Sequence, residues 1–135
     1  MGMTIAEKVL ARASSRTTVV PGEYVTARID QAMGNDVFSD VYRVLKDAGI
    51  EKAWDPSRIA VILDHYVPAP SILWAEEHKL AREAVRRLGI PLYDMNAGIC
   101  HQIMMEKGHV IPGELVVGTD SHTTTYGALG AAGTG

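Results

Sequence analysis

Apolar and polar positions follow one another along the chain in a pattern that predicts helices separated by short strands. Apolar residues three to four positions apart indicate amphipathic helices, and short unbroken apolar runs indicate buried strands. The pattern predicts helices over 5–13, 40–48, 71–88 and 98–106, and strands over 24–29, 58–63, 91–93 and 114–117. Strands that alternate with helices predict an α/β domain, here a three-layer α/β/α arrangement with a mostly parallel sheet.

The ends of two predicted helices carry clear signals. Thr4 and Glu7 have the spacing of a capping box at the first helix. In the helix over 71–88, Leu73, Leu80 and Val85 lie on the expected buried face, and Gly89 ends the helix. His78 stands among the charged residues of this helix and His109 in a loop, so we expect both at the surface.

Composition and charge exclude several classes of protein. The 135 residues are enough for one domain, and 47% apolar with 21% charged residues is ordinary for a soluble globular protein. A net charge of −3 argues against nucleic acid or an anionic membrane as a partner. No run reaches the roughly 18 apolar residues of a membrane helix, and we expect a cytoplasmic protein.

The single cysteine, Cys100, excludes an internal disulfide framework and a multi-cysteine metal site made by this sequence alone. We expect it to be a small buried residue in a reducing compartment. The stretch GALGAAGTG at residues 127–135 contains four glycines and no charge. Glycine is costly to order and poor at ending an element, so this stretch is expected to be a loop or helix entry that is cut off partway. We therefore expect residues 1–135 to be one domain at the N-terminal end of a longer chain.

Two of the predicted strands are followed by similar polar groups. Asp64-His65 follows the run 58–63, and Asp120-Ser121-His122 follows the run 114–117. If the strands are parallel neighbours, both groups lie at one edge of the sheet and can face one cleft. A third imidazole, His101, stands in GICHQI.

Carboxylates beside imidazoles point to proton transfer near neutral pH, because the carboxylate orients the ring and raises its basicity. Each Asp–His pair is also typical of a turn with a capped helix, and His101 alone is also typical of a buried core histidine. Ser121 and His122 do not form a nucleophile–base pair, because adjacent side chains diverge.

Three stretches together resemble a known family. The segment GICHQIMMEKGHVIPGELVVGTDSHTTTYGALGAAGTG closely resembles the aconitase superfamily, in particular its 3-isopropylmalate dehydratase large subunits and their homoaconitase relatives. ILDHYVP resembles the DH-x-VP element of that group, and MTIAEKVLARAS resembles its usual opening. The resemblance covers nearly the whole chain.

The resemblance implies a hydro-lyase for a hydroxylated di- or tricarboxylic acid, such as 3-isopropylmalate, homoaconitate or dimethylmalate. It implies a [4Fe-4S] cluster held by three cysteines, which we expect beyond residue 135. It also implies a small, swivelling-domain subunit as partner, which supplies a serine base and substrate-binding arginines. We therefore expect the 135-residue chain alone to be inactive, with no nucleic acid or membrane among its partners.

The resemblance also implies a role for each polar residue. Asp64 and His65 help to protonate the leaving hydroxyl, and His101 is paired with Asp120. His122 lies beside the cluster and its bound water. Two residues are implied to bind substrate, Ser121 and Asn35.

The segment AMGNDVFSD departs from what related subunits commonly have there. Asn35 takes the place of a polar residue that contacts substrate in the family, and Phe38 replaces a small hydroxyl residue. This departure leaves the identity of the acid open. Two other functions also stay open: a metal-dependent hydrolase and a non-catalytic regulatory domain of the same fold. The hydrolase would use the cluster of Asp64, His65, His101, Asp120 and His122 as zinc or iron ligands.

Overall fold

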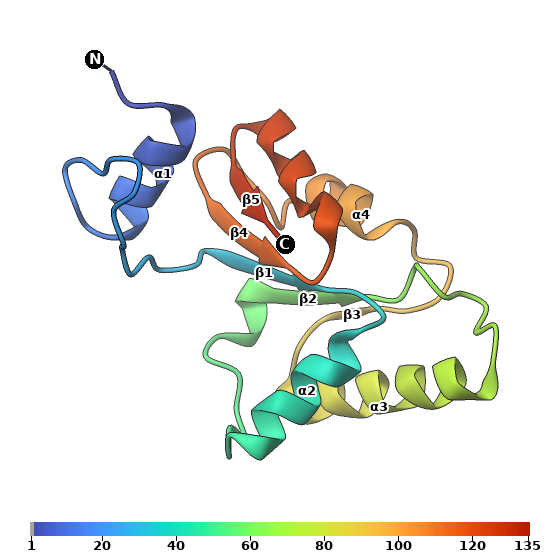
Figure 1. Cartoon of the computed structure of the whole chain (residues 1–135). Helices are drawn as coiled ribbons and strands as arrows, with labels where there is room; N and C mark the ends of the chain where they lie inside the picture. Colours follow the sequence, from blue (N-terminus) through green and yellow to red (C-terminus); the bar gives the residue numbers. More distant parts are fainter. Residues whose placement is uncertain (1) are drawn as a thin grey trace.

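The computed structural model describes residues 2–135, in which five parallel strands form one sheet (Figure 1). The strand order is β3-β2-β1-β4-β5, and every neighbouring pair runs parallel. The strands are β1 (Gln31–Gly34), β2 (Ile59–Ile62), β3 (Leu92–Tyr93), β4 (Leu115–Gly118) and β5 (Ala132–Thr134). The expected parallel α/β sheet is confirmed.

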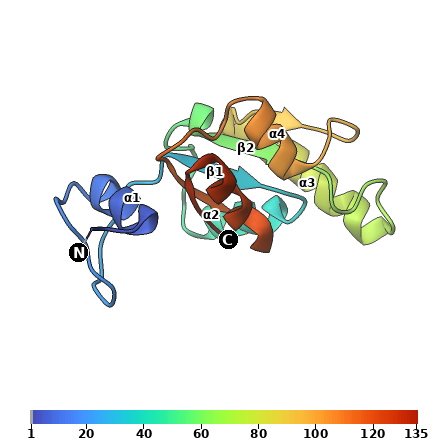
Figure 2. The same cartoon turned by 90° about the horizontal axis from the view of Figure 1, so that it is seen from above.

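Helices cover both faces of this sheet (Figures 1 and 2). On one face, α2 (Phe38–Asp47) and α3 (Ile72–Leu88) pack with β2 around Val61 and Leu63. On the other face, α4 (Cys100–Glu106) and the 3₁₀ helix η2 (Ser121–Leu129) enclose Ile62 and Val116. A parallel sheet needs helices on both faces to bury its strands, and these three layers are the expected α/β/α arrangement.

The first helix, α1 (Ile5–Ala13), lies beside the strands at the β4–β5 side of the sheet. Its capping box is formed as predicted: the Glu7 backbone N–H donates to the Thr4 hydroxyl, and Glu7 Oε2 accepts from the Thr4 backbone N–H. Val9 and Ala13 pack on Leu115 of β4. This packing buries Val9 of the expected apolar stripe, whereas Ile5 at the start of the helix is 64% exposed.

Helix α3 begins and ends as predicted, and its expected face is buried at Val85 and Leu88, but two positions differ from the expectation. The Ser71 side chain accepts from the Trp74 backbone N–H, and Gly89 ends the helix with a φ of +70°. Leu73, expected in the core, is 66% exposed, whereas His78, expected at the surface, is 1% exposed. His78 points inward because it bonds to Asp36, a buried carboxylate in the loop after β1.

The strand expected over 24–29 is wrong. These residues form no regular element, and Tyr24 is 98% exposed. The Arg28 backbone N–H donates to Ala13 at the end of α1 instead of to a strand. The β-forming residues of this stretch therefore lie outside the sheet, and the pairing strand β1 starts at Gln31. Strand β5, which pairs with β4, is absent from the predicted set because its Ala-Gly-Thr sequence lacks an apolar run.

Strand β1 stands where the strand order changes direction, with β2 on one side and β4 on the other. Strands β2 and β4 are therefore separated by β1 instead of being neighbours. The carboxyl ends of all three meet at the same edge of the sheet, the usual ligand site in open α/β folds. Gly118 ends β4 there, and a Cβ at this position would overlap the Thr123 hydroxyl, so glycine lets η2 fold back against the strand.

Candidate active site

The chain segments after β1 and β4 are bonded to each other across the edge of the sheet. The Asn35 backbone N–H donates to the Thr119 hydroxyl oxygen (2.9 Å), and that hydroxyl donates to Asn35 Oδ1 (2.7 Å). Asn35 is 4% exposed, and its side-chain oxygen also accepts from the Val37 backbone N–H. Asn35 therefore lies at the expected edge, where its side chain links two loops; its contact with substrate stays a prediction.

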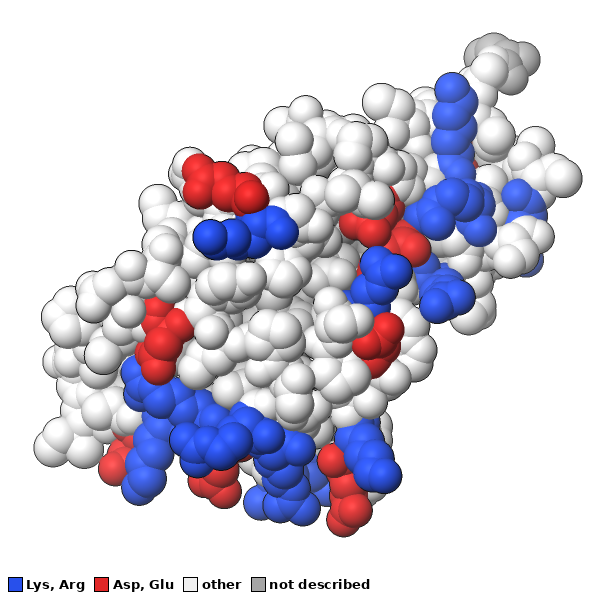
Figure 3. Space-filling view, turned by 180° about the vertical axis from the view of Figure 1, so that it is seen from behind, with Lys and Arg blue, Asp and Glu red and all other residues white. Residues whose placement is uncertain are grey.

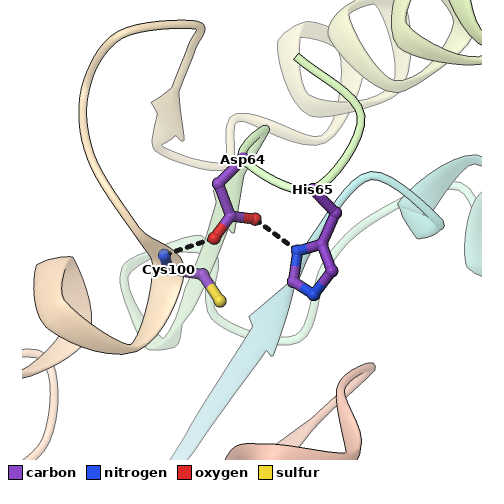
Figure 4. Close-up of side chains that lie close together, drawn as sticks. All are labelled: Asp64, His65 and Cys100. Atoms are coloured by element: carbon purple, nitrogen blue, oxygen red, sulfur yellow. Dashed lines mark hydrogen bonds and ion pairs between the residues drawn. The ribbon is translucent and has the colours of Figure 1, made fainter. Parts of the chain in front are cut away.

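The first Asp–His pair links the end of β2 to the start of α4 (Figure 4). His65 Nδ1 lies 2.7 Å from Asp64 Oδ1, and the other Asp64 oxygen accepts from the Cys100 backbone N–H at 2.6 Å. The Asp64 carboxylate therefore orients the imidazole and fixes the loop against the helix at the same time.

Asp120 brings the remaining groups together. Its Oδ2 lies 3.0 Å from His65 Nε2, and its Oδ1 lies 2.8 Å from His101 Nε2. The same Oδ1 accepts from the His122 backbone N–H at 2.8 Å, which caps η2. Two imidazoles that are far apart in the sequence thus meet on one carboxylate.

The ring of His101 is held from its other side by a residue that the sequence analysis missed. Tyr126 in η2 is fully buried, and its hydroxyl lies 3.2 Å from His101 Nδ1. With Nε2–H donating to Asp120, Nδ1 of the neutral ring accepts from the tyrosine. No sequence signal pointed to Tyr126, because a tyrosine in a glycine-rich segment has many other uses.

The surroundings of the His65–Asp120 bond shift the pKa of each partner so that its charged form is favoured. Burial alone raises the pKa of Asp120, but the His122 backbone N–H, His101 and His65 outweigh it and lower the pKa to about 2. Burial lowers the pKa of His65, but hydrogen bonds and charges from Asp64 and Asp120 outweigh it and raise the pKa above 6.5. A ring with a carboxylate on each nitrogen favours the imidazolium, which can donate a proton.

The side chains differ in how far they reach solvent. Those of His65 and His122 are 38% and 82% exposed, whereas that of His101 is 17% exposed. Ser121 is also exposed, and its hydroxyl lies 3.4 Å from His122 Nδ1. An approaching molecule therefore meets His65, Ser121 and His122 first, with His101 behind them.

Two buried or half-buried histidines correct the expectation of surface positions. His78 Nε2 donates to Asp36, a fully buried carboxylate that the sequence analysis did not single out. His109 is half-buried, with Nε2 2.7 Å from the Tyr93 hydroxyl, and burial lowers its pKa. The charged neighbours of His78 in sequence lie on other sides of α3, which is why sequence context misplaced it.

The chain matches known proteins over its whole length. The family model of the aconitase family (aconitate hydratase) matches residues 74–135. The chain is 50% identical to 3-isopropylmalate dehydratase large subunit 1 of Methanopyrus kandleri and 52% identical to the large subunit of Aquifex aeolicus. Both matches cover 100% of this chain and 32% of the relative. The chain is thus similar to the aconitase family and to these large subunits.

The match to large subunit 1 of Pyrococcus furiosus is 47% identical, over 99% of this chain and 32% of the relative. The chain thus spans about a third of the length of the curated relatives it matches. The expected resemblance to the N-terminal part of this branch of the aconitase family is confirmed.

The aconitase family implies a [4Fe-4S] cluster, and the described residues do not fit it as ligands. They contain one thiol, Cys100, which is fully buried as expected. Burial and the neighbouring Asp64 raise the pKa of this thiol, whereas cluster ligation needs thiolates. Asp64, His65 and Cys100 place donor atoms within 4.8 Å of one another (Figure 4), but this trio holds a single thiol, too few for an iron–sulfur cluster.

The surface of the protein carries both signs of charge. In the view from behind, basic side chains gather along the lower edge, over α2 and α3, with acidic side chains at the margins of this group and a broad uncharged area above it (Figure 3). Within residues 2–135, no helix has the length and apolar character needed to cross a membrane.

Proposed function

We propose that residues 1–135 form a single α/β domain that supplies the proton-donor side of an iron–sulfur hydro-lyase. The observation that carries this proposal is the Asp120 carboxylate, which holds His65 through one oxygen and His101 through the other. Catalysis by positioned proton transfer needs this combination of an oriented ring and a charged form within reach of solvent. The names of the relatives, which are dehydratase large subunits, support the same reaction class.

In the proposed dehydration, the substrate hydroxyl takes the place of Asp120 at His65 Nε2, and the imidazolium donates its Nε2 proton to that hydroxyl. The C–O bond breaks, water leaves, and the neutral ring stays bonded to Asp64. His101 acts behind it by holding Asp120, with Tyr126 fixing the ring. Ser121 binds a substrate carboxylate, and His122 lies beside the departing water. The base that removes the carbon-bound proton lies outside this sequence.

The cluster would act as a Lewis acid on the substrate when it is bound. This chain offers one buried thiol, so we propose that cysteines outside this sequence hold the cluster. We propose a hydroxylated di- or tricarboxylic acid as the substrate, with 3-isopropylmalate the first to test, then homoaconitate and dimethylmalate. Asn35 and Phe38 lie at the segment that bears on this choice. A small subunit is the proposed partner.

Metal content separates this proposal from a metal-dependent hydrolase. In the complete protein, iron with labile sulfide supports the dehydratase, and stoichiometric zinc supports the hydrolase. Anaerobic reconstitution of the 135-residue chain with iron and sulfide is expected to give no stable cluster absorbance, because three cysteines are needed. A stoichiometric [4Fe-4S] spectrum from this chain would contradict the proposal.

The proton donor is tested by His65→Asn in the complete, cluster-loaded enzyme with 3-isopropylmalate. Loss of a positioned proton donor lowers kcat by ~10²–10⁴-fold. His109→Asn is the matched control, since His109 bonds to Tyr93 and not to the Asp120 network. Equal kcat values for the two variants would return His65 to a purely structural role.

A further inference from the structure

Asp36 is a fully buried carboxylate directly behind the turn that carries Asp64 and His65. It follows β1 by two residues, and β1 pairs in parallel with β2. The first loop residues after β2 therefore pass over the Asp36 side chain. This places a buried charge against the backbone of the candidate proton donor without placing it in contact with solvent.

Each carboxylate oxygen of Asp36 accepts two hydrogen bonds. Oδ2 accepts from the backbone N–H groups of Asp64 (3.0 Å) and His65 (2.8 Å). Oδ1 accepts from the Tyr66 backbone N–H (3.2 Å) and from His78 Nε2 (2.7 Å). Three successive backbone donors converging on one carboxylate fix the path of the turn, and hydrogen bonds to an ionised acceptor are the strong kind.

Helix α3 holds this arrangement at two points. His78, 1% exposed, donates to Asp36. One turn earlier on the same helix, the Trp74 ring stacks on the Tyr66 ring with centroids 3.5 Å apart and 15° between the planes. The turn over residues 64–66 is therefore tied to the helix through its backbone by Asp36 and through its side chain by Tyr66.

We propose that Asp36, held in place by His78, is the positioning residue of the proton donor. By fixing the backbone of residues 64–66, it keeps His65 Nε2 within hydrogen-bond distance of Asp120. Asp36 touches neither substrate nor the reacting atoms, so it acts through His65. This inference rests on the proposed function of His65 as proton donor.

The chemistry of the side chains explains why these two residue types suit the task. A carboxylate only accepts, so it can bind four donors at once, whereas an amide in its place turns one acceptor into a donor that opposes the backbone N–H groups. His78 needs only one donor directed at Oδ1. A glutamine at 78 can supply a comparable N–H, and a phenylalanine cannot.

The positioning is tested first on the full 135-residue chain by nuclear magnetic resonance. Asp36→Asn and His78→Phe are expected to speed hydrogen exchange at the amides of residues 64–66 and to shift the ¹⁵N signals of the His65 ring. His78→Gln is expected to keep both close to those of the unmodified chain. Asp55→Asn is the control, since Asp55 also accepts a backbone N–H, from Ser57, in a turn remote from the site.

The catalytic part is tested in the complete cluster-loaded enzyme with 3-isopropylmalate as the probe. Because a misplacement of about 1 Å costs ~10²-fold in rate, Asp36→Asn and His78→Phe are expected to lower kcat by ~10²-fold with KM nearly unchanged. His78→Gln is expected to restore most of kcat. Unchanged amide exchange and unchanged His65 ring signals in His78→Phe would overturn the proposal even if Asp36→Asn fails to fold. An unmodified enzyme that does not act on the three proposed acids defeats the proposed function, while the resonance data still decide the positioning of His65.

Discussion

The two polar turns of the site contain the same residue types but are held in different ways. The turn after β2 is fixed from outside, because Asp36 accepts three of its backbone N–H groups. The turn after β4 is capped from within, because Asp120 accepts the N–H of His122 two residues later, and its outside link to Asn35 goes through the Thr119 side chain. The first turn therefore keeps its own carboxylate, Asp64, available for His65, whereas the second uses one carboxylate both for its cap and for two distant rings.

This difference separates two uses of an aspartate that look alike in sequence. Asp64 serves the ring next to it and the start of α4. Asp120 joins His65 and His101, so its removal breaks the links of the turn after β4 to the turn after β2 and to α4, while the link of Asp64 to α4 stays. We therefore expect the second turn to be the more sensitive of the two to a single substitution.

The largest effect is expected for Asp120→Asn. The amide removes the charge that holds both imidazoles, so kcat of the complete enzyme with 3-isopropylmalate is expected to fall by ~10²–10⁴-fold, and at least as far as for Asp64→Asn. Circular dichroism spectra like those of the unmodified chain would show that the fold is kept. A smaller loss for Asp120→Asn than for Asp64→Asn would reverse the comparison.

His101→Ala is expected to give the next largest effect, within the same ~10²–10⁴-fold range. Because His101 acts through Asp120, the double variant with Asp120→Asn should lose much less than the sum of the two single losses in free energy. A double-mutant cycle on kcat/KM measures this coupling. Additive losses would show that His101 and Asp120 act separately, and an unchanged rate in His101→Ala would make it an ordinary core histidine.

The smallest expected effect is on the titration of two residues, His65 in the turn after β2 and Asp120 in the turn after β4. We expect His65 to titrate above 6.5 and Asp120 near 2, whereas His109 titrates below 6.5 as an internal control. The depressed pKa of Asp120 stabilises the fold above the ordinary range of a carboxyl, about 4, and this contribution is lost as the pH falls toward 2.

The raised pKa of His65 acts in the opposite direction: its contribution is complete below 6.5 and is lost as the pH rises through the folded-state value. Ring and carboxyl chemical shifts followed from acid to alkaline pH measure both. An Asp120 midpoint near 4 would show that the carboxylate does not hold the imidazoles in solution.

Much of the fold could be predicted because local patterns and tertiary packing agree. The short apolar run around Ala60 and Val61 predicts a buried strand, and both residues are fully buried. Gly89 can adopt the left-handed conformation that ends α3. The stretch 24–29 failed because its β-forming residues find no neighbouring strand. Propensity alone does not supply a pairing partner.

The candidate site was only partly accessible from sequence. Asp64, His65 and Asp120 follow apolar runs, so their place at one edge of a parallel sheet could be inferred. Asp36 and His78 gave no such signal, because they matter through their contact with each other, and the two residues are 42 positions apart in the sequence. A buried charge is rare unless it is paired, so its partner becomes evident only in three dimensions.

The buried thiol of Cys100 can be used to measure how often one part of the site opens. It is fully buried at the start of α4, and its raised pKa keeps it in the unreactive protonated form. We expect it to react with an alkylating reagent when the packing around the start of α4 opens, where the Asp64 carboxylate accepts the Cys100 backbone N–H. The rate of alkylation of this single cysteine therefore reports how often the junction between the loop after β2 and α4 opens, without any label added to the protein.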